Sequence, residues 1–179
     1  MAKRNSSQSG AGTAAASALA RPNSTPEQAR EELSKLFNVG LNEIALYKLE
    51  KGLLRFLFPV ELKTAGTIPV SSSIAVSART AAEKKAELFN NFTKVKHASV
   101  FESVKGNQKE AKQSDQLPIQ KLISAPILDR DGDVVGVIQI CRKGADLSCG
   151  PDFSLEDLKQ VELAAKALGE TVFMQHLDE

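Results

Sequence analysis

The chain has 179 residues, of which 42% are hydrophobic and 25% are charged, and its formal net charge is +1. This length and apolar content suit one well-cored domain and fall short of what two domains need. The near-neutral charge favours neither a nucleic acid nor a membrane surface as a partner, and the apolar runs are far shorter than the ~20 residues of a membrane span.

The first segment, residues 1–24 (MAKRNSSQSGAGTAAASALARPNS), is rich in Ser, Ala, Gly and Asn. Because this composition buries too little apolar surface to offset its ordering entropy, we expect a disordered N-terminal tail. A secretory signal is the alternative, but alanine and serine would make its apolar region weak. Cys141 and Cys149 provide no disulfide framework. We therefore expect a cytoplasmic protein with one folded domain over residues 25–177.

The first ordered element is expected to be a helix that begins at the sequence TPEQ. Thr25 as N-cap, Pro26 at the first helical position and Gln28 three residues after the cap form a capping box. The helix should end between Asn38 and Gly40. Its apolar face comprises Ala29, Leu33, Leu36 and Phe37.

Two extended segments follow the first helix. The sequence NEIALYKLEKGLLRFLFP holds two β-rich runs around a Lys51-Gly52 turn, which predicts a hairpin over residues 43–58. The short run TIPV, residues 67–70, predicts a further strand. The serines of SSSIAVSARTAA (Ser71, Ser72 and Ser73) can then cap a helix.

The middle of the chain is less regular. Residues 84–90, KKAELFN, are strand-like, and a long polar segment extends from there to Pro118. Loops of that length in compact domains are usually functional or mobile. The stretch from Lys84 to Lys121 holds eight lysines against four acids, so a cavity beside it would favour an anion; a solvated lysine-coated surface is the alternative.

The sequence LDRDGDVVGVIQI, residues 128–140, carries three aspartates and a glycine, which resembles a calcium loop. An EF-hand loop requires a bidentate glutamate at its twelfth position, and the residue twelfth from Asp129 is Ile140. Asp131-Gly132 instead suits a tight turn between two strand-like runs. We therefore expect a hairpin and no metal site.

The last element is predicted to be a helix of more than about 20 residues that starts at Ser154, with Asp157 completing the cap. Five apolar residues on this helix repeat at three- and four-residue steps, as in the seam of a helix pair. We expect them either to form a homodimer or partner seam or to pack into the domain's own core. They are Leu158, Val161, Ala165, Leu168 and Val172.

Hairpins near both ends of the chain favour an antiparallel sheet covered by helices over a doubly wound parallel one. From about residue 33 to 173 the sequence resembles a GAF domain, most specifically in LISAPILDRDGDVVGVIQICRKG and FSLEDLKQVELAAKALG. The resemblance implies an α+β fold with a six-stranded antiparallel sheet. It also implies N- and C-terminal helices on one face, and a helix and loops around a small-molecule pocket on the other.

The resemblance implies a sensory or regulatory module, and specialised branches of the family can be compared with this sequence. Residues 60–118 contain no cysteine that could attach a chromophore covalently. Free methionine-(R)-sulfoxide reductases rely on cysteines in the pocket loops, whereas Cys141 lies in a predicted strand and Cys149 in the linker after it. Family members that bind cyclic nucleotides carry a pattern of Asn, Lys, Phe, Asp and Glu residues, and only part of that pattern is present here. No nucleophile, metal cluster or phosphate-binding loop is recognisable, so we expect no catalytic residues and no enzyme activity.

If a ligand binds, we expect it between the serine-capped helix start and the following polar loop, because helix N-termini attract anions and aromatic rings supply apolar walls. The expected ligand residues are Ser71, Ser72, Ser73, Phe92, His97 and Phe101. The ligand and any cofactor remain unnamed. A ligand-free dimerisation module and, less favoured, a GAF-type enzyme are the alternatives to a small-molecule sensor that acts through a partner or dimer.

Overall fold

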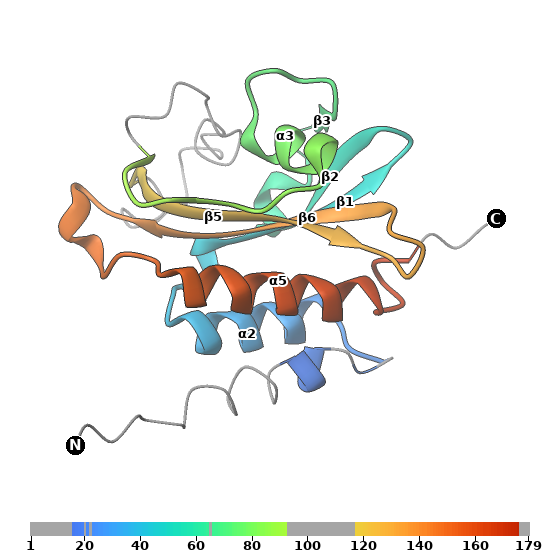
Figure 1. The fold of residues 1–179 in the computed structure, drawn as a ribbon, viewed down its shortest axis with the longest axis horizontal. Coiled ribbons are helices and arrows are strands. Elements are labelled where there is room, and N and C mark those ends of the chain that lie inside the picture. The colour runs from blue at the N-terminus through green and yellow to red at the C-terminus, as the bar shows by residue number, and fades with distance from the viewer. Residues whose placement is uncertain (1–15, 20, 22, 65, 93–116, 176–179) are drawn as a thin grey trace.

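The computed structural model describes residues 16–19, 21, 23–64, 66–92 and 117–175. A six-stranded sheet runs through its centre, with strands in the order β3-β2-β1-β6-β5-β4 and every neighbouring pair antiparallel (Figure 1). This confirms the expected α+β architecture. The strands are β1 (Ile44–Glu50), β2 (Leu53–Phe58), β3 (Thr67–Pro69), β4 (Glu87–Phe89), β5 (Ile119–Leu128) and β6 (Val134–Lys143).

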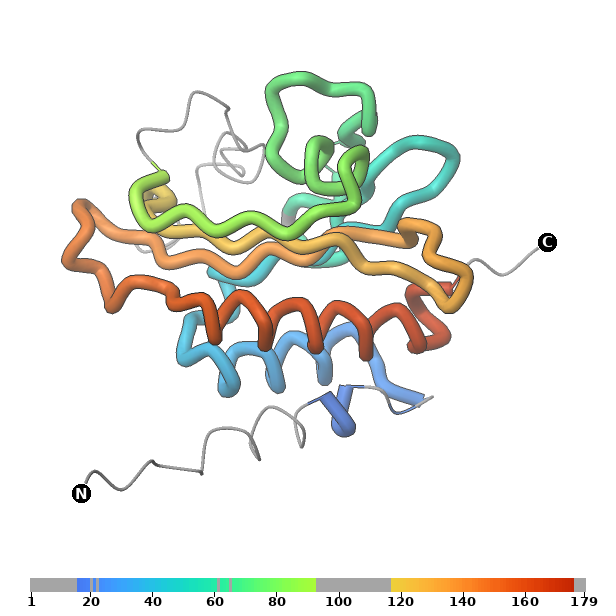
Figure 2. The backbone as a smooth tube through the Cα atoms, viewed as in Figure 1, coloured from blue at the N-terminus to red at the C-terminus, as the bar shows by residue number. Residues whose placement is uncertain are grey.

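Helices cover both faces of the sheet. Helices α2 (Pro26–Phe37) and α5 (Leu155–Gly169) lie on one face, and α3 (Val76–Glu83) lies on the other (Figures 1 and 2). Among the described helices, none has both the length and the apolar composition of a membrane span.

Helix α2 has the expected capping. The Thr25 hydroxyl accepts from the Gln28 backbone amide, and the Gln28 side chain accepts from the Thr25 backbone amide. Asn38 ends the helix in the left-handed conformation, which its short polar side chain tolerates. Local sequence therefore fixes both ends of α2.

The two predicted hairpins are present. Lys51 and Gly52 both have positive φ, as the tight turn between β1 and β2 requires. Between β5 and β6, the Asp129 carboxylate accepts hydrogen bonds from the backbone amides of Asp131 and Asp133, and Gly132 has a φ of +83°. The Asp129 carboxylate thus serves the turn itself.

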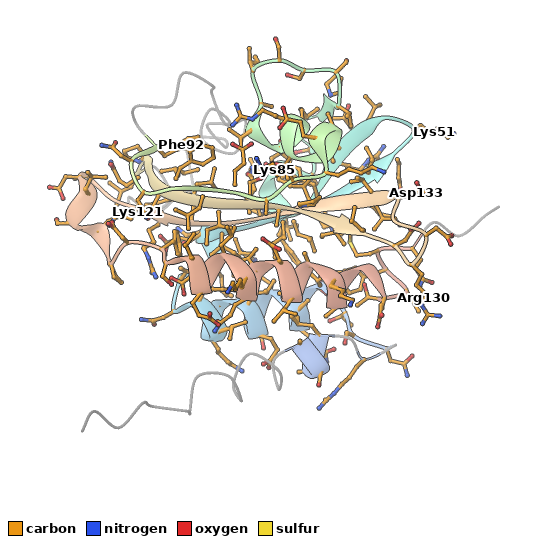
Figure 3. All side chains as sticks on the ribbon, in the orientation of Figure 1. Lys51, Lys85, Phe92, Lys121, Arg130 and Asp133 are labelled. Atoms are coloured by element: carbon orange, nitrogen blue, oxygen red, sulfur yellow. The ribbon has the colours of Figure 1, made fainter. Side chains whose placement is uncertain are left out.

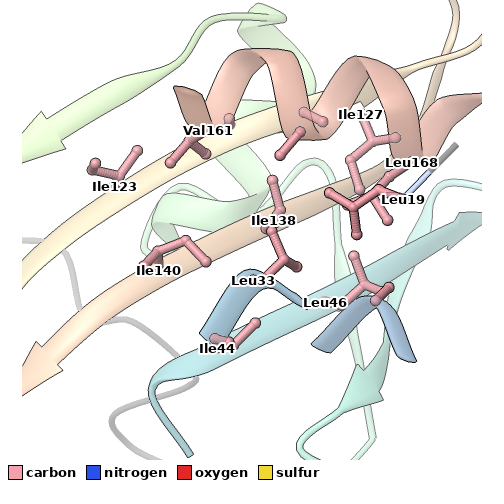
Figure 4. Close-up of a cluster of buried hydrophobic side chains, with 14 of the residues drawn as sticks. Leu19, Leu33, Ile44, Leu46, Ile123, Ile127, Ile138, Ile140, Val161 and Leu168 are labelled. Atoms are coloured by element: carbon pink, nitrogen blue, oxygen red, sulfur yellow. The ribbon is translucent and has the colours of Figure 1, made fainter. Parts of the chain in front are cut away.

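Two hydrophobic cores flank the sheet. The first packs the sheet against α2 and α5, and Figure 4 shows part of it, including Leu33, Ile138, Val161 and Leu168. The second packs the opposite face against α3, and its members include Phe56, Val76 and Phe92. We call these the α5-side core and the α3-side core.

The N-terminal segment differs from the expected tail to residue 24. Residues 16–19 form one helical turn, and Leu19 is 1% exposed within the α5-side core (Figure 4). The Ser24 hydroxyl also donates to the Ala18 carbonyl. The folded unit therefore extends upstream of α2 because one leucine finds an apolar site there. Residues 1–15 lie outside the described ranges.

The last helix is shorter than predicted. Ser154 and Asp157 form the expected capping box, but α5 ends at Gly169 after 15 residues. The Thr171 hydroxyl donates to the Leu168 carbonyl and helps turn the chain away from the helix axis. Val172 consequently lies beyond the helix.

Candidate functional site

Five neutral polar side chains lie buried between α3 and the sheet, and we call them the polar cluster. None is more than 2% exposed. Three come from the strands and two from α3, so the cluster joins the helix to the sheet. Its members are Tyr47 of β1, Ser77 and Thr80 of α3, Ser124 of β5 and Gln139 of β6.

The hydrogen bonds of the polar cluster form a chain with one direction. The Tyr47 hydroxyl donates to Gln139 Oε1 (3.2 Å), and Gln139 Nε2 donates to Ser124 Oγ (3.2 Å). Thr80 Oγ1 donates its hydrogen to the Val76 carbonyl (2.8 Å). Because that hydrogen is used, Ser124 must be the donor in its 2.7 Å contact with Thr80. The chain thus runs from Tyr47 to the first turn of α3.

The polar cluster carries no charge at neutral pH. Burial raises the pKa of Tyr47 well above its ordinary value, and a hydrogen bond with the Ser77 side chain offsets only part of that rise. Serine, threonine and glutamine side chains do not titrate in this range. The site therefore offers hydrogen-bond donors and acceptors without an electrostatic charge.

An ion pair lies at the β4 edge of the site. Arg79 of α3 donates from Nε and Nη2 to the two carboxylate oxygens of Glu87, each at 2.8 Å. This two-point contact fixes the orientation of both side chains. It ties the middle of α3 to the edge strand β4.

The sequence-predicted ligand residues are only partly brought together. Phe92 is buried in the α3-side core and packs edge-on against Phe89, with ring centroids 5.9 Å apart. Ser71 and Ser73 are exposed, and Ser72 is half-buried, in the segment after β3. His97 and Phe101 lie outside the described residues.

The expected serine cap of α3 is not formed. The N-cap is Ala75, which makes no side-chain capping bond, and the helix begins at Val76. Ile74, directly before this N-cap, is 61% exposed. The serines precede the helix because Val76, Ala78 and Ala81 supply the face that packs on the sheet.

Sequence reasoning missed the polar cluster, although it left a signal. Ser124 and Gln139 are single polar residues inside otherwise apolar strand runs, ISAPIL and VIQIC. Such residues on an inner sheet face must find partners. Their partners lie far along the chain, so the pattern marks the positions without naming the contacts.

The family model of the GAF domain matches residues 27–172. The chain belongs to the GAF domain family. No curated protein matches its sequence.

Solved structures of low sequence identity share the fold. The GAF domain of an Acinetobacter phosphoenolpyruvate-protein phosphotransferase has a TM-score of 0.65 at 11% identity, covering 93% of this chain and 92% of that one. Residues 122 to 287 of a methyl-accepting chemotaxis protein have a TM-score of 0.58 at 10% sequence identity, and the match covers 89% of this chain and 92% of that one. The reduced form of fRMsr of Staphylococcus aureus has a TM-score of 0.55 at 18% sequence identity, and the match covers 94% of this chain and 97% of that one.

In this GAF domain the predicted dimer seam lies largely inside the molecule. Val161, Ala165 and Leu168 are at most 3% exposed and belong to the α5-side core, and Leu158 is partly buried beside them. These residues face the domain's own sheet because a helix that covers a sheet buries one apolar stripe. Val172 is exposed but follows the helix end. The seam therefore corresponds to core packing.

The two cysteines of this GAF domain do not meet as a reactive pair in the described structure. Cys141 is fully buried in the α3-side core, and Cys149 is half-buried on the segment before α5, where its thiol contacts the Arg142 carbonyl at 3.9 Å. Within the described ranges, no three His, Cys, Asp or Glu side chains are grouped as metal ligands would be.

Proposed function

We propose that this GAF domain is a sensory module that binds a small molecule between α3 and the sheet and acts through a partner or a second copy. The polar cluster supports this most strongly. Burying neutral polar groups adds less stability than apolar packing would, and such networks are often retained for specificity. Five of them where one short helix meets the sheet suit recognition of a ligand's own donors and acceptors.

The neutral character of the cluster bears on the class of ligand. The lysines of residues 84–121 left open either an anion-binding cavity or a solvated surface, and those of residues 93–116 lie outside the described ranges. Lys121 is buried on the α5 side and pairs with Asp152 at 2.9 Å. Lys84 donates to the Gly132 carbonyl. We therefore favour a ligand whose buried part is uncharged, with any anionic group directed away from the polar cluster.

This proposal predicts ligand-dependent stabilisation. Adenine, guanine and their nucleotides are tested by calorimetric melting, because a ligand at 100 times its Kd adds about 2.7 kcal/mol to the free energy of unfolding. Ser77→Ala removes one hydroxyl from the site and is expected to reduce the ligand-induced rise in melting temperature. The matched variant Ser73→Ala, on an exposed serine, should leave it unchanged.

Native mass spectrometry of the protein as purified from cells extends this test to ligands outside the panel. A retained small molecule that Ser77→Ala releases and Ser73→Ala does not would support the proposal. Binding that is equally sensitive to both substitutions would contradict the placement under α3.

A ligand-free interaction module is the second candidate, favoured by the exposed face of α5. Leu155 and Leu163 are 74% and 50% exposed there, and a shallow groove is lined by Lys159, Glu162, Leu163 and Lys166. We propose that a second copy of the chain covers this face. In an antiparallel pair of α5 helices crossing at residues 160–161, Lys159 faces Glu162 of the other copy.

The dimer is tested by light scattering across protein concentration. Leu163→Glu is expected to convert a dimeric mass to a monomeric one without unfolding the domain, because Leu163 already contacts solvent. Val60→Glu, at an exposed position outside α5, is the control and should stay dimeric. A monomeric mass of the unmodified protein at ~100 μM would remove this hypothesis.

An enzyme of the free methionine-(R)-sulfoxide reductase type remains the least supported alternative. The similarity to fRMsr is one of fold, at 18% identity. Thiol chemistry needs an accessible thiolate, whereas Cys141 is fully buried. We also propose a cytoplasmic location, where thiols such as those of Cys141 and Cys149 are kept reduced.

A further inference from the structure

The segment between β6 and α5, residues 144–153, is held by side chains from the start of β5 and from the residue that follows β4. Asn90, directly after β4, makes two hydrogen bonds with the backbone of Phe153: its Nδ2 donates to the carbonyl (2.9 Å) and its Oδ1 accepts from the amide (2.8 Å). Phe153 immediately precedes Ser154, the N-cap of α5. One amide side chain therefore fixes the residue from which α5 starts.

Two residues of β5 hold the same segment. Gln120 Nε2 donates to the Gly144 carbonyl (2.9 Å), and Lys121 Nζ donates to the Gly150 carbonyl (2.6 Å) while pairing with Asp152. Lys121 is 3% exposed, so these contacts are the compensation for its buried charge. We call Asn90, Gln120 and Lys121 the α5 clamp.

The α5 clamp lies next to residues of the opposite core. Phe92 is two residues after Asn90 and packs in the α3-side core, whereas Phe153, the partner of Asn90, packs in the α5-side core. Likewise, Lys121 faces the segment before α5, and Leu122 belongs to the α3-side core. Figure 3 shows Phe92 and Lys121 at the same end of the sheet.

We infer that Asn90 couples the α3-side core to the start of α5, so that displacement of Phe92 loosens the first turn of the helix. Only Asn91 separates Asn90 from Phe92, so a shift of the Phe92 backbone has one residue over which to be taken up before it reaches Asn90. That amide satisfies both backbone groups of Phe153, and its loss leaves them unpaired. The biological use of this coupling rests on the proposed function, since a ligand under α3 would be what moves Phe92.

Amide hydrogen exchange of the full chain, followed by NMR, tests the coupling without any ligand. The main readout is the Leu158 amide, which donates to the Ser154 carbonyl in the first turn of α5. Phe92→Leu replaces the aromatic ring in the α3-side core with a smaller aliphatic side chain. We expect Leu158 exchange to accelerate about tenfold relative to the Leu168 amide, which reports the far end of the helix.

Three further variants make the result specific. Ile68→Val perturbs the same core at the opposite edge of the sheet and should leave the exchange ratio unchanged. In the Asn90→Ala background, Phe92→Leu should raise the ratio of Leu158 to Leu168 exchange rates by less than about twofold, because the hydrogen bonds to Phe153 are already absent. Asn90→Asp keeps the acceptor for the Phe153 amide and loses the donor, so it should retain part of the coupling.

The inference is overturned if Phe92→Leu leaves the Leu158 to Leu168 ratio unchanged, or if Ile68→Val changes it equally. It is also overturned if the effect of Phe92→Leu persists in full with Asn90→Ala. If Asn90→Ala does not fold, the effect of Phe92→Leu is measured in the Asn90→Asp background instead. None of these outcomes depends on ligand binding, so the coupling and the proposed function can fail separately.

Discussion

Replacing Gly169 by alanine is expected to lower the free energy of unfolding by about 3 kcal/mol. Gly169 is the last residue of α5, and a Cβ atom there would lie 1.9 Å from the Leu128 carbonyl oxygen and 3.0 Å from its carbon. Both are backbone atoms at the end of β5, so no flexible side chain can give way. The end of the helix would have to move off the sheet.

Urea denaturation of the two proteins measures this loss. The helix propensity of alanine works in the opposite direction, by up to about 1 kcal/mol, so a destabilisation would be due to the contact. Glu170→Ala, one residue on and exposed, is the control and should change stability by less than about 0.5 kcal/mol. Equal effects of the two substitutions would argue against close packing of Gly169 on β5.

Leu19→Ala is expected to cost about 2–3 kcal/mol of unfolding free energy, at the lower end for a buried leucine because the short turn can relax. Leu19 is 1% exposed in the α5-side core although it lies in a Ser- and Ala-rich segment. The control is Leu41→Ala, the same substitution at a leucine that is 45% exposed, which should cost clearly less.

A truncated protein provides an independent check on the same segment. A chain starting at Asn23 should lose about as much stability as Leu19→Ala, because both remove the leucine side chain from its site. Unchanged unfolding midpoints for both proteins would show that residues 16–19 are not part of the stable fold, as composition alone suggested.

The elements that sequence predicted best are those set by local chemistry. The capping box at Thr25 and Gln28 and the turn at Lys51-Gly52 each depend on residues within a few positions, so a pattern is sufficient. The start of α3 was misplaced because three serines resemble a cap, whereas packing on the sheet selects Val76 as the first helical residue. Tertiary contacts there override the local signal.

The candidate site was harder to predict because its contacts are distant in sequence. Thr80 and Ser124 are 44 residues apart, and Tyr47 and Gln139 are 92 apart. The apolar repeat on α5 has a similar limit. It correctly marked Val161 and Leu168 as members of one stripe, but periodicity alone does not say whether that stripe meets the domain's own sheet or another chain.

Tyr47 is the single tyrosine of the sequence, which contains no tryptophan. Nearly all of the protein's intrinsic ultraviolet fluorescence must therefore come from one phenol ring, and that ring lies in the polar cluster with its hydroxyl bonded to Gln139. Phenol emission is sensitive to the acceptor of the hydroxyl and to water. The chain thus carries a label-free optical probe at the candidate site, and entry of a molecule beneath α3 would be recorded by it directly.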